Sequence, residues 1–172
     1  DATAQSFRDQ FATLTLGSGA VAMIVCRGDL SKSGHTINGS VTRAATRHSR
    51  LCLGQRDHMT ADASKVLIFG VELAKNTWDL ASSSLHRWSD AQIDAYMPHQ
   101  VSRRNMEVLN DKLGLTPEKH HLNFPTLGNI GPAAVPITLG QAAESGRIRS
   151  GDHVALMGIG SGLNCLMLGI QW

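Results

Sequence analysis

Two polar side chains suited to binding a reactive ligand lie 30 positions apart in this sequence. His99 lies in the stretch MPHQ at positions 97–100, and Asn129 lies in the stretch LGNIG at positions 127–131. The N–H₂ group of an asparagine can donate hydrogen bonds to a developing oxyanion, and a helix N-terminus behind it adds positive potential. The stretch GIGSG at 158–162 adds glycines, which let backbone N–H groups approach a ligand closely. These residue types favour chemistry in which negative charge develops on an oxygen atom.

Each of these features also has a simpler structural interpretation. His99 alone could be a surface or structural histidine, and Asn129 alone could be a turn residue between two glycines. The glycine stretch alone could be the turn of a hairpin. His48 and His58 flank Cys52, but their spacing matches no metal-binding pattern, so we expect no metal site. The chemical interpretation therefore depends on whether the three features meet in space.

The apolar pattern predicts the elements that would position these residues. A stripe of helical period runs through 62–86, and the continuous apolar run at 20–26 is typical of a strand buried on both faces. We expect 46–60 to be a long loop and 36–45 to be a strand antiparallel to 20–26. The remaining predicted strands are 93–97, 121–124, 153–157 and 164–170, and the remaining predicted helices are 101–113 and 132–145. Alternating strands and helices predict an α/β fold with a mixed, mostly parallel sheet and helices on both faces.

Composition excludes several classes of protein. The chain has 172 residues, with 16 basic and 14 acidic side chains, and this balance does not favour nucleic-acid binding. No apolar run is long enough to predict a membrane span, and residues 1–16 do not resemble a signal peptide. Three separated cysteines without a CxxC pair favour a reducing, cytoplasmic setting. We expect Cys26 and Cys165 to be small core residues, because both lie in apolar runs.

The order of these stretches resembles the C-terminal half of the ketoacyl synthase III family. The likeness is closest to the bacterial enzyme that joins two fatty acyl-CoA molecules head to head in olefin biosynthesis, and it covers nearly the whole chain. It rests on five stretches of sequence: FATLTLGSGA at 11–20, YMPHQ at 96–100, GNIGPAAVP at 128–136, RIRSGD at 147–152 and GIGSGL at 158–163.

This resemblance implies a thiolase-like fold of two similar halves, each with a five-stranded sheet. Residues 1–46 would end the N-terminal half, and residues 47–172 would form the C-terminal half. The family joins acyl thioesters by acyl transfer to a cysteine and Claisen condensation, without a cofactor. His99 and Asn129 would then stabilise the enolate of the second thioester. The backbone at Gly160, Ser161 and Gly162 would supply another oxyanion hole, centred on the N–H of Ser161.

The resemblance also bears on the substrate and on partners. Arg104 matches a basic residue near the entrance for phosphopantetheine, where it would meet CoA or an acyl carrier protein. Ser102 stands where many relatives place an asparagine that contacts the pantetheine, and a solvated role for Arg104 stays open. None of the three cysteines matches the family nucleophile, which would lie in a missing N-terminal half. We therefore expect a chain that is inactive alone and exposes an apolar docking surface that favours homo-oligomers. The alternatives are a non-catalytic half that binds acyl chains, CoA or a partner, and one chain of a split enzyme.

Overall fold

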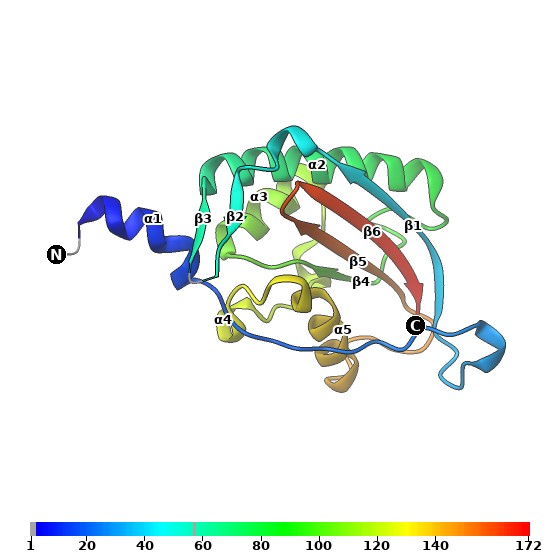
Figure 1. The fold of residues 1–172 in the computed structure, drawn as a ribbon. Coiled ribbons are helices and arrows are strands. Elements are labelled where there is room, and N and C mark those ends of the chain that lie inside the picture. Colours follow the sequence, from blue (N-terminus) through cyan, green and yellow to red (C-terminus); the bar gives the residue numbers. More distant parts are fainter. Residues whose placement is uncertain (1–2, 57) are drawn as a thin grey trace.

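A twisted four-stranded sheet forms the centre of the computed structural model, which describes residues 3–56 and 58–172 (Figure 1). Its strand order is β1-β6-β5-β4. The neighbours β1–β6 and β6–β5 pair antiparallel, and β5–β4 pair parallel. The strands of this sheet are β1 (Thr36–Ala44), β4 (Ala95–Pro98), β5 (His153–Gly160) and β6 (Asn164–Gln171). The predicted mixed α/β architecture is confirmed, but a mostly parallel sheet is wrong for the described residues.

A single parallel bridge between Tyr96 and His120 lies where a fifth strand would extend this sheet. The strand predicted at 121–124 is absent from the described structure, because the chain turns there into the short helix α4 (Phe124–Leu127). The predicted loop at 46–60 contains the short strand β2 (Cys52–Gly54), which pairs antiparallel with β3 (Met59–Ala61). This hairpin packs against α1 (Ala4–Leu14), which lies at one end of the molecule (Figure 1).

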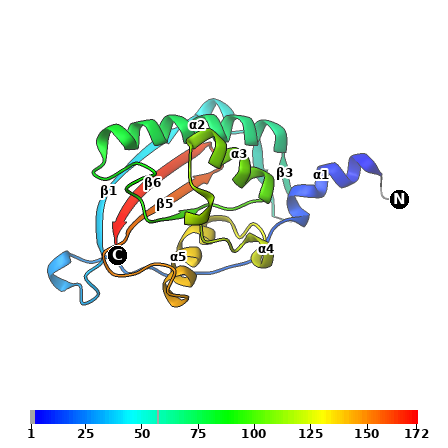
Figure 2. The same ribbon diagram turned by 180° about the vertical axis from the view of Figure 1, so that it is seen from behind.

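Helices cover both faces of the sheet, as predicted. α2 (Ala63–Ser84) and α3 (Arg103–Leu113) lie on one face, and α5 (Ala134–Glu144) lies on the other (Figure 2). The stripe predicted for α2 forms its buried side, where Trp78 packs near Tyr96 of β4. Asp62 caps this helix, since its side chain accepts a hydrogen bond from Lys65 N at 3.1 Å. The described residues also contain the 3₁₀ turns η1 (Gly28–Leu30), η2 (Thr46–His48), η3 (Pro117–Lys119) and η4 (Gly131–Ala133).

The apolar run at 20–26 is not a buried strand. It is extended chain without strand pairing among the described residues, and the side chain of Ile24 is 95% exposed. Cys26 is exposed as well, so its predicted core position is wrong, whereas Cys165 is buried as predicted. β1 therefore pairs with β6 and not with the 20–26 run. An apolar sequence identifies a surface that must be covered, but it does not identify what covers it.

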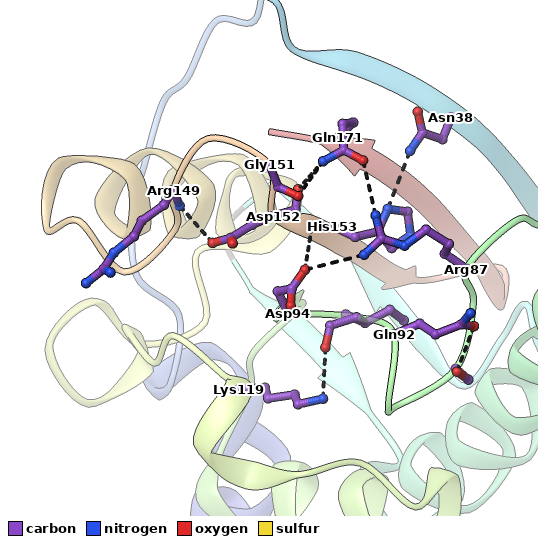
Figure 3. A network of polar contacts seen from close by, with 12 residues as sticks. Asn38, Arg87, Gln92, Asp94, Lys119, Arg149, Gly151, Asp152, His153 and Gln171 are labelled. Carbon is purple, nitrogen blue, oxygen red and sulfur yellow. Dashed lines mark hydrogen bonds and ion pairs between the residues drawn. The ribbon is translucent and has the colours of Figure 1, made fainter.

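A network of polar side chains links the strands at the amino end of β5 (Figure 3). The backbone N–H of His153 donates to a carboxylate oxygen of Asp94 at 2.7 Å, and its buried ring contacts the carboxamide of Asn38 at 3.4 Å. Arg87 donates to Gln171 at 3.4 Å and lies 4.0 Å from Asp94. These contacts join β1, β5 and β6 at the end of the sheet away from the carboxyl ends of β4 and β5.

Two further findings concern the chain as a whole. No helix in the described residues is long and apolar enough to cross a bilayer. The boundary predicted near residue 46 remains a proposal. β1, which precedes it, already belongs to the same sheet as β4, β5 and β6.

Candidate active site

His99 lies directly beyond the carboxyl end of β4. Its backbone N–H donates to the carbonyl oxygen of Met157 in β5 at 2.8 Å, which continues the parallel pairing by one residue. The buried Pro98 before it restricts the backbone to a narrow range of φ. The imidazole is therefore attached to a rigid point at the edge where ligands bind in open α/β sheets.

Asn129 lies in the loop between α4 and η4, and its backbone is held on both sides. Its N–H donates to the carbonyl of Thr15 at 3.1 Å, and its carbonyl accepts from Gly17 N at 2.9 Å. This bridge fixes Asn129 against the segment that follows α1. Gly128 adopts φ 67° and ψ −159°, a backbone conformation that is essentially restricted to glycine, so the turn into Asn129 depends on it.

The backbone of Gly131 brings His99 and Asn129 together. The Oδ1 atom of Asn129 accepts a hydrogen bond from Gly131 N at 3.1 Å. The imidazole of His99 interacts with the Gly131 backbone as well. With its oxygen engaged in this way, the Asn129 carboxamide keeps its N–H₂ group for a ligand. The imidazole and the carboxamide predicted from the sequence therefore both interact with the Gly131 backbone, at the start of η4, which packs against β5.

Burial sets the charge of the imidazole. Desolvation lowers the pKa of His99 below the ordinary histidine value, and the Gly131 backbone opposes this effect only in part. His99 is therefore neutral at pH 7. A neutral imidazole and a carboxamide form a polar but uncharged pair, which suits the stabilisation of charge that develops only during a reaction.

Fewer residues of the glycine stretch at 158–162 lie in the turn than the sequence suggested. Gly158 and Gly160 belong to β5, opposite Leu166 and Asn164 of β6, so only 161–163 form the turn. Gly162 takes φ 131°, and in the described chain the N–H of Ser161 makes no hydrogen bond. The strand ends three residues beyond Met157, so at about 3.3 Å per residue the turn begins roughly 10 Å past the level of His99. An oxyanion hole at Gly160, Ser161 and Gly162 remains a proposal.

The two residues proposed for CoA or carrier-protein binding lie together at the start of α3. Ser102 is the N-cap, and its hydroxyl accepts from Asn105 N at 3.3 Å. This bond uses one lone pair of the hydroxyl oxygen and leaves its O–H and its second lone pair for a ligand. Arg104 is exposed in the first turn, and no ion pair of its own appears among the described residues. Its guanidinium is free to meet a phosphate or a carboxylate.

No group of three His, Cys, Asp or Glu side chains in the described chain is placed to bind a metal ion. The sequence did not reveal the part played by the Gly131 backbone, nor that the Gln100 carboxamide is buried and hydrogen-bonded to the backbone of His121, Asn123 and Phe124. Main-chain hydrogen bonds carry no residue-type signature, and only the glutamine next to His99 could have suggested a buried polar anchor.

Comparisons with known proteins agree with this geometry. The family described as 3-oxoacyl-(acyl-carrier-protein) synthase III C-terminal matches residues 84–172, just over half of the chain. An acyl-CoA:acyl-CoA alkyltransferase from Xanthomonas campestris pv. campestris is 42% identical over 172 residues, covering all of this chain and 51% of the relative. A beta-ketoacyl-(acyl-carrier-protein) synthase III from Staphylococcus saprophyticus is 26% identical over 167 residues, covering 96% of this chain and 52% of the relative. The chain thus spans about half the length of the curated relatives it matches.

Solved structures show the same fold. A variant of OleA from Xanthomonas campestris, crystallised with lauric acid and lauroyl-CoA, superimposes with a TM-score of 0.95 at 42% identity. The match covers all of this chain and 51% of that one, and it confirms the predicted thiolase-like fold. The chain therefore belongs to the 3-oxoacyl-(acyl-carrier-protein) synthase III C-terminal family, whose named relatives here are condensing acyltransferases.

Proposed function

We propose that this chain is the C-terminal catalytic portion of an enzyme that condenses two acyl thioesters. The observation that carries the proposal is the meeting of His99 and Asn129 on the Gly131 backbone, at the carboxyl end of β4. Asn129 donates a hydrogen bond from its N–H₂ group to the carbonyl oxygen of the second thioester, and His99 donates its single N–H to the same oxygen once the substrate displaces it from the Gly131 backbone. As its α-carbon loses a proton, or carbon dioxide, this oxygen gains negative charge, which the two donors stabilise.

The reaction also needs a nucleophile, and we propose that none of the three cysteines of this chain supplies it. Burial raises the pKa of Cys165, so its thiol resists forming the thiolate that attacks a thioester. Cys26 is exposed on the unpaired 20–26 run, and Cys52 lies in β2. We therefore propose that the nucleophilic cysteine belongs to an N-terminal half, and that this chain alone does not complete the condensation.

The surface of the chain supports docking of such a half. Large apolar side chains are exposed along one continuous stretch of the chain, from α1 into the 20–26 run, as in the series Phe7, Phe11, Leu14, Leu16, Val21, Met23, Ile24 and Val25. Soluble monomers rarely expose a large contiguous apolar surface, so we expect chain 1–172 without its partner to self-associate. A clean monomer by sedimentation at high concentration would contradict this expectation.

The catalytic proposal is tested in a protein that contains these residues together with the N-terminal half. Release of free CoA from an acyl-CoA substrate measures turnover. We expect His99→Ala and Asn129→Ala each to lower kcat by about 100-fold to 1,000-fold, as removal of one oxyanion donor does in other enzymes. His86→Ala is the matched control, because that histidine is exposed. Full activity of the double variant would refute the assigned roles.

A further inference from the structure

The side chain next to His99 is a fully buried carboxamide in which both ends form hydrogen bonds. Gln100 is 0% exposed, and its Nε2 donates to the carbonyl of His121 at 2.8 Å. Its Oε1 accepts from two consecutive backbone N–H groups, those of Asn123 at 2.9 Å and Phe124 at 3.2 Å. Placing a carboxamide in the protein interior is costly without such partners, so this position selects strongly for glutamine.

The two accepted hydrogen bonds cap α4 from outside the helix. Asn123 is the N-cap residue of α4, but its own side chain makes no capping bond. The first N–H groups of a helix lack partners within the helix. Gln100 Oε1 takes the place of the missing cap, although it comes from a residue 23 positions earlier. The start of α4 is therefore attached to the residue that follows His99.

A second set of contacts connects the start of α4 to α5. The side chain of Asn123 donates to the hydroxyl of Thr138 at 2.7 Å, and that hydroxyl donates to the carbonyl of Ala134 at 2.6 Å. Gln100 Nε2 lies 3.5 Å from the same hydroxyl. Asn129 lies between these attachments, five residues after Phe124 and five before Ala134. Both flanks of the Asn129 loop are thus fixed to one buried network.

We propose that Gln100 is a positioning residue that sets the distance between the His99 imidazole and the Asn129 carboxamide. This inference rests on the proposed function of that pair. Gln100 does not contact the thioester. It acts through α4, which carries the turn at Gly128 and hence Asn129.

Two substitutions separate this role from simple packing. Gln100→Met keeps a long side chain and removes both hydrogen-bonding ends. Gln100→Glu keeps the shape but, when ionised, directs a carboxylate oxygen at the His121 carbonyl, which offers no proton. When protonated, the same glutamate donates to that carbonyl and accepts from Asn123 and Phe124, which restores the native pattern. Burial raises the pKa of such a glutamate, so protonation occurs in an accessible pH range.

The experiment uses the full-length protein and measures kcat and KM for CoA release between about pH 9.5 and about pH 6.5, a range that brackets the pKa of about 8–9 documented for buried glutamates. We expect Gln100→Met to lower kcat by roughly 100-fold, the cost of a displacement of about 1 Å in a catalytic group, with KM nearly unchanged. The ratio of Gln100→Glu activity to wild-type activity should rise as the pH falls. Using the ratio removes the contributions of His99 and His121, which titrate in both proteins. Gln92→Met, at an exposed glutamine, is the control.

Amide hydrogen exchange at Asn123 and Phe124 gives a readout that does not depend on turnover. Gln100→Met should lose protection at both amides, and Gln100→Glu should regain it at low pH. Unchanged protection, or unchanged kcat despite lost protection, overturns the inference. An inactive wild-type protein would refute the proposed function, while the exchange data would still test whether Gln100 anchors α4.

Discussion

Gly17 provides a strong test of how Asn129 is held, because the close approach of two backbone segments leaves no room for a side chain there. A Cβ atom built on Gly17 would lie 1.9 Å from the carbonyl oxygen of Leu127 and 2.8 Å from the side chain of Ile130. The first contact involves backbone and cannot be relieved by a rotamer change. Gly17→Ala must therefore separate the two segments by more than 1 Å, since ordinary contacts begin at about 3.4 Å.

This separation breaks the bridge that fixes Asn129. The bonds from Gly17 N to the Asn129 carbonyl, at 2.9 Å, and from Asn129 N to the Thr15 carbonyl, at 3.1 Å, are both lost or stretched. Two such bonds contribute about 1–3 kcal/mol together. Overpacking adds about 1–3 kcal/mol, so we expect the free energy of unfolding to fall by about 2–6 kcal/mol. A displacement of about 1 Å at Asn129 should also lower kcat by roughly 100-fold.

The assay compares Gly17→Ala with Gly19→Ala in the full-length protein, by urea denaturation and by CoA release. A Cβ atom at Gly19 meets only side-chain atoms, the nearest being the flexible end of Ile137 at 3.0 Å, so this control should be mild. Hydrogen exchange at the Asn129 amide reports the bridge directly. If Gly17→Ala matches the control in stability, exchange and turnover, the bridge does not position Asn129.

Two further predictions follow from buried imidazoles. Burial lowers the pKa of His120 to about 4, and both of its ring nitrogens lack partners in the described residues. The unfolded chain therefore binds a proton before the folded one, and stability should fall by about 3 kcal/mol as the pH drops from 6.5 to 4. Urea denaturation across this range should show a shallower pH slope for His120→Phe than for wild type. Equal slopes in the two proteins would exclude His120 as the source. Burial also lowers the pKa of His99, so its ring should titrate below pH 6.5 by NMR, and a midpoint above that value would contradict the burial of this ring.

The helices and the placement of the candidate site could be predicted because their signals are local. The apolar stripe of α2 repeats every three or four residues within one helix, and the structure buries it. His99 and Asn129 were identified as residues that follow a strand or precede a helix. Both positions hold in the structure, although the strand predicted before Asn129 is the short helix α4.

The errors involve partners that are distant in sequence. The run at 20–26 has the composition of a buried strand, yet Val25 is 72% exposed, because burial depends on a neighbouring sheet that an apolar pattern cannot specify. The segment at 121–124 has strand-like residues, but Gln100 supplies the missing helix cap and Pro125 suits the first turn of α4. Local propensity was overridden in this segment by one buried side chain 23 positions away.

The arrangement of the Asn129 loop couples the candidate site to the exposed apolar segment. Thr15 and Gly17 hold the backbone of Asn129, and the unpaired 20–26 run begins three residues after Gly17. A partner that covers this run restricts the motion of the chain just before it, and hence of the bridge. Docking of the proposed N-terminal half would then do more than deliver a cysteine. It would also reduce the conformational freedom of the Asn129 carboxamide before substrate binds, which is the condition under which a fixed donor lowers a reaction barrier most.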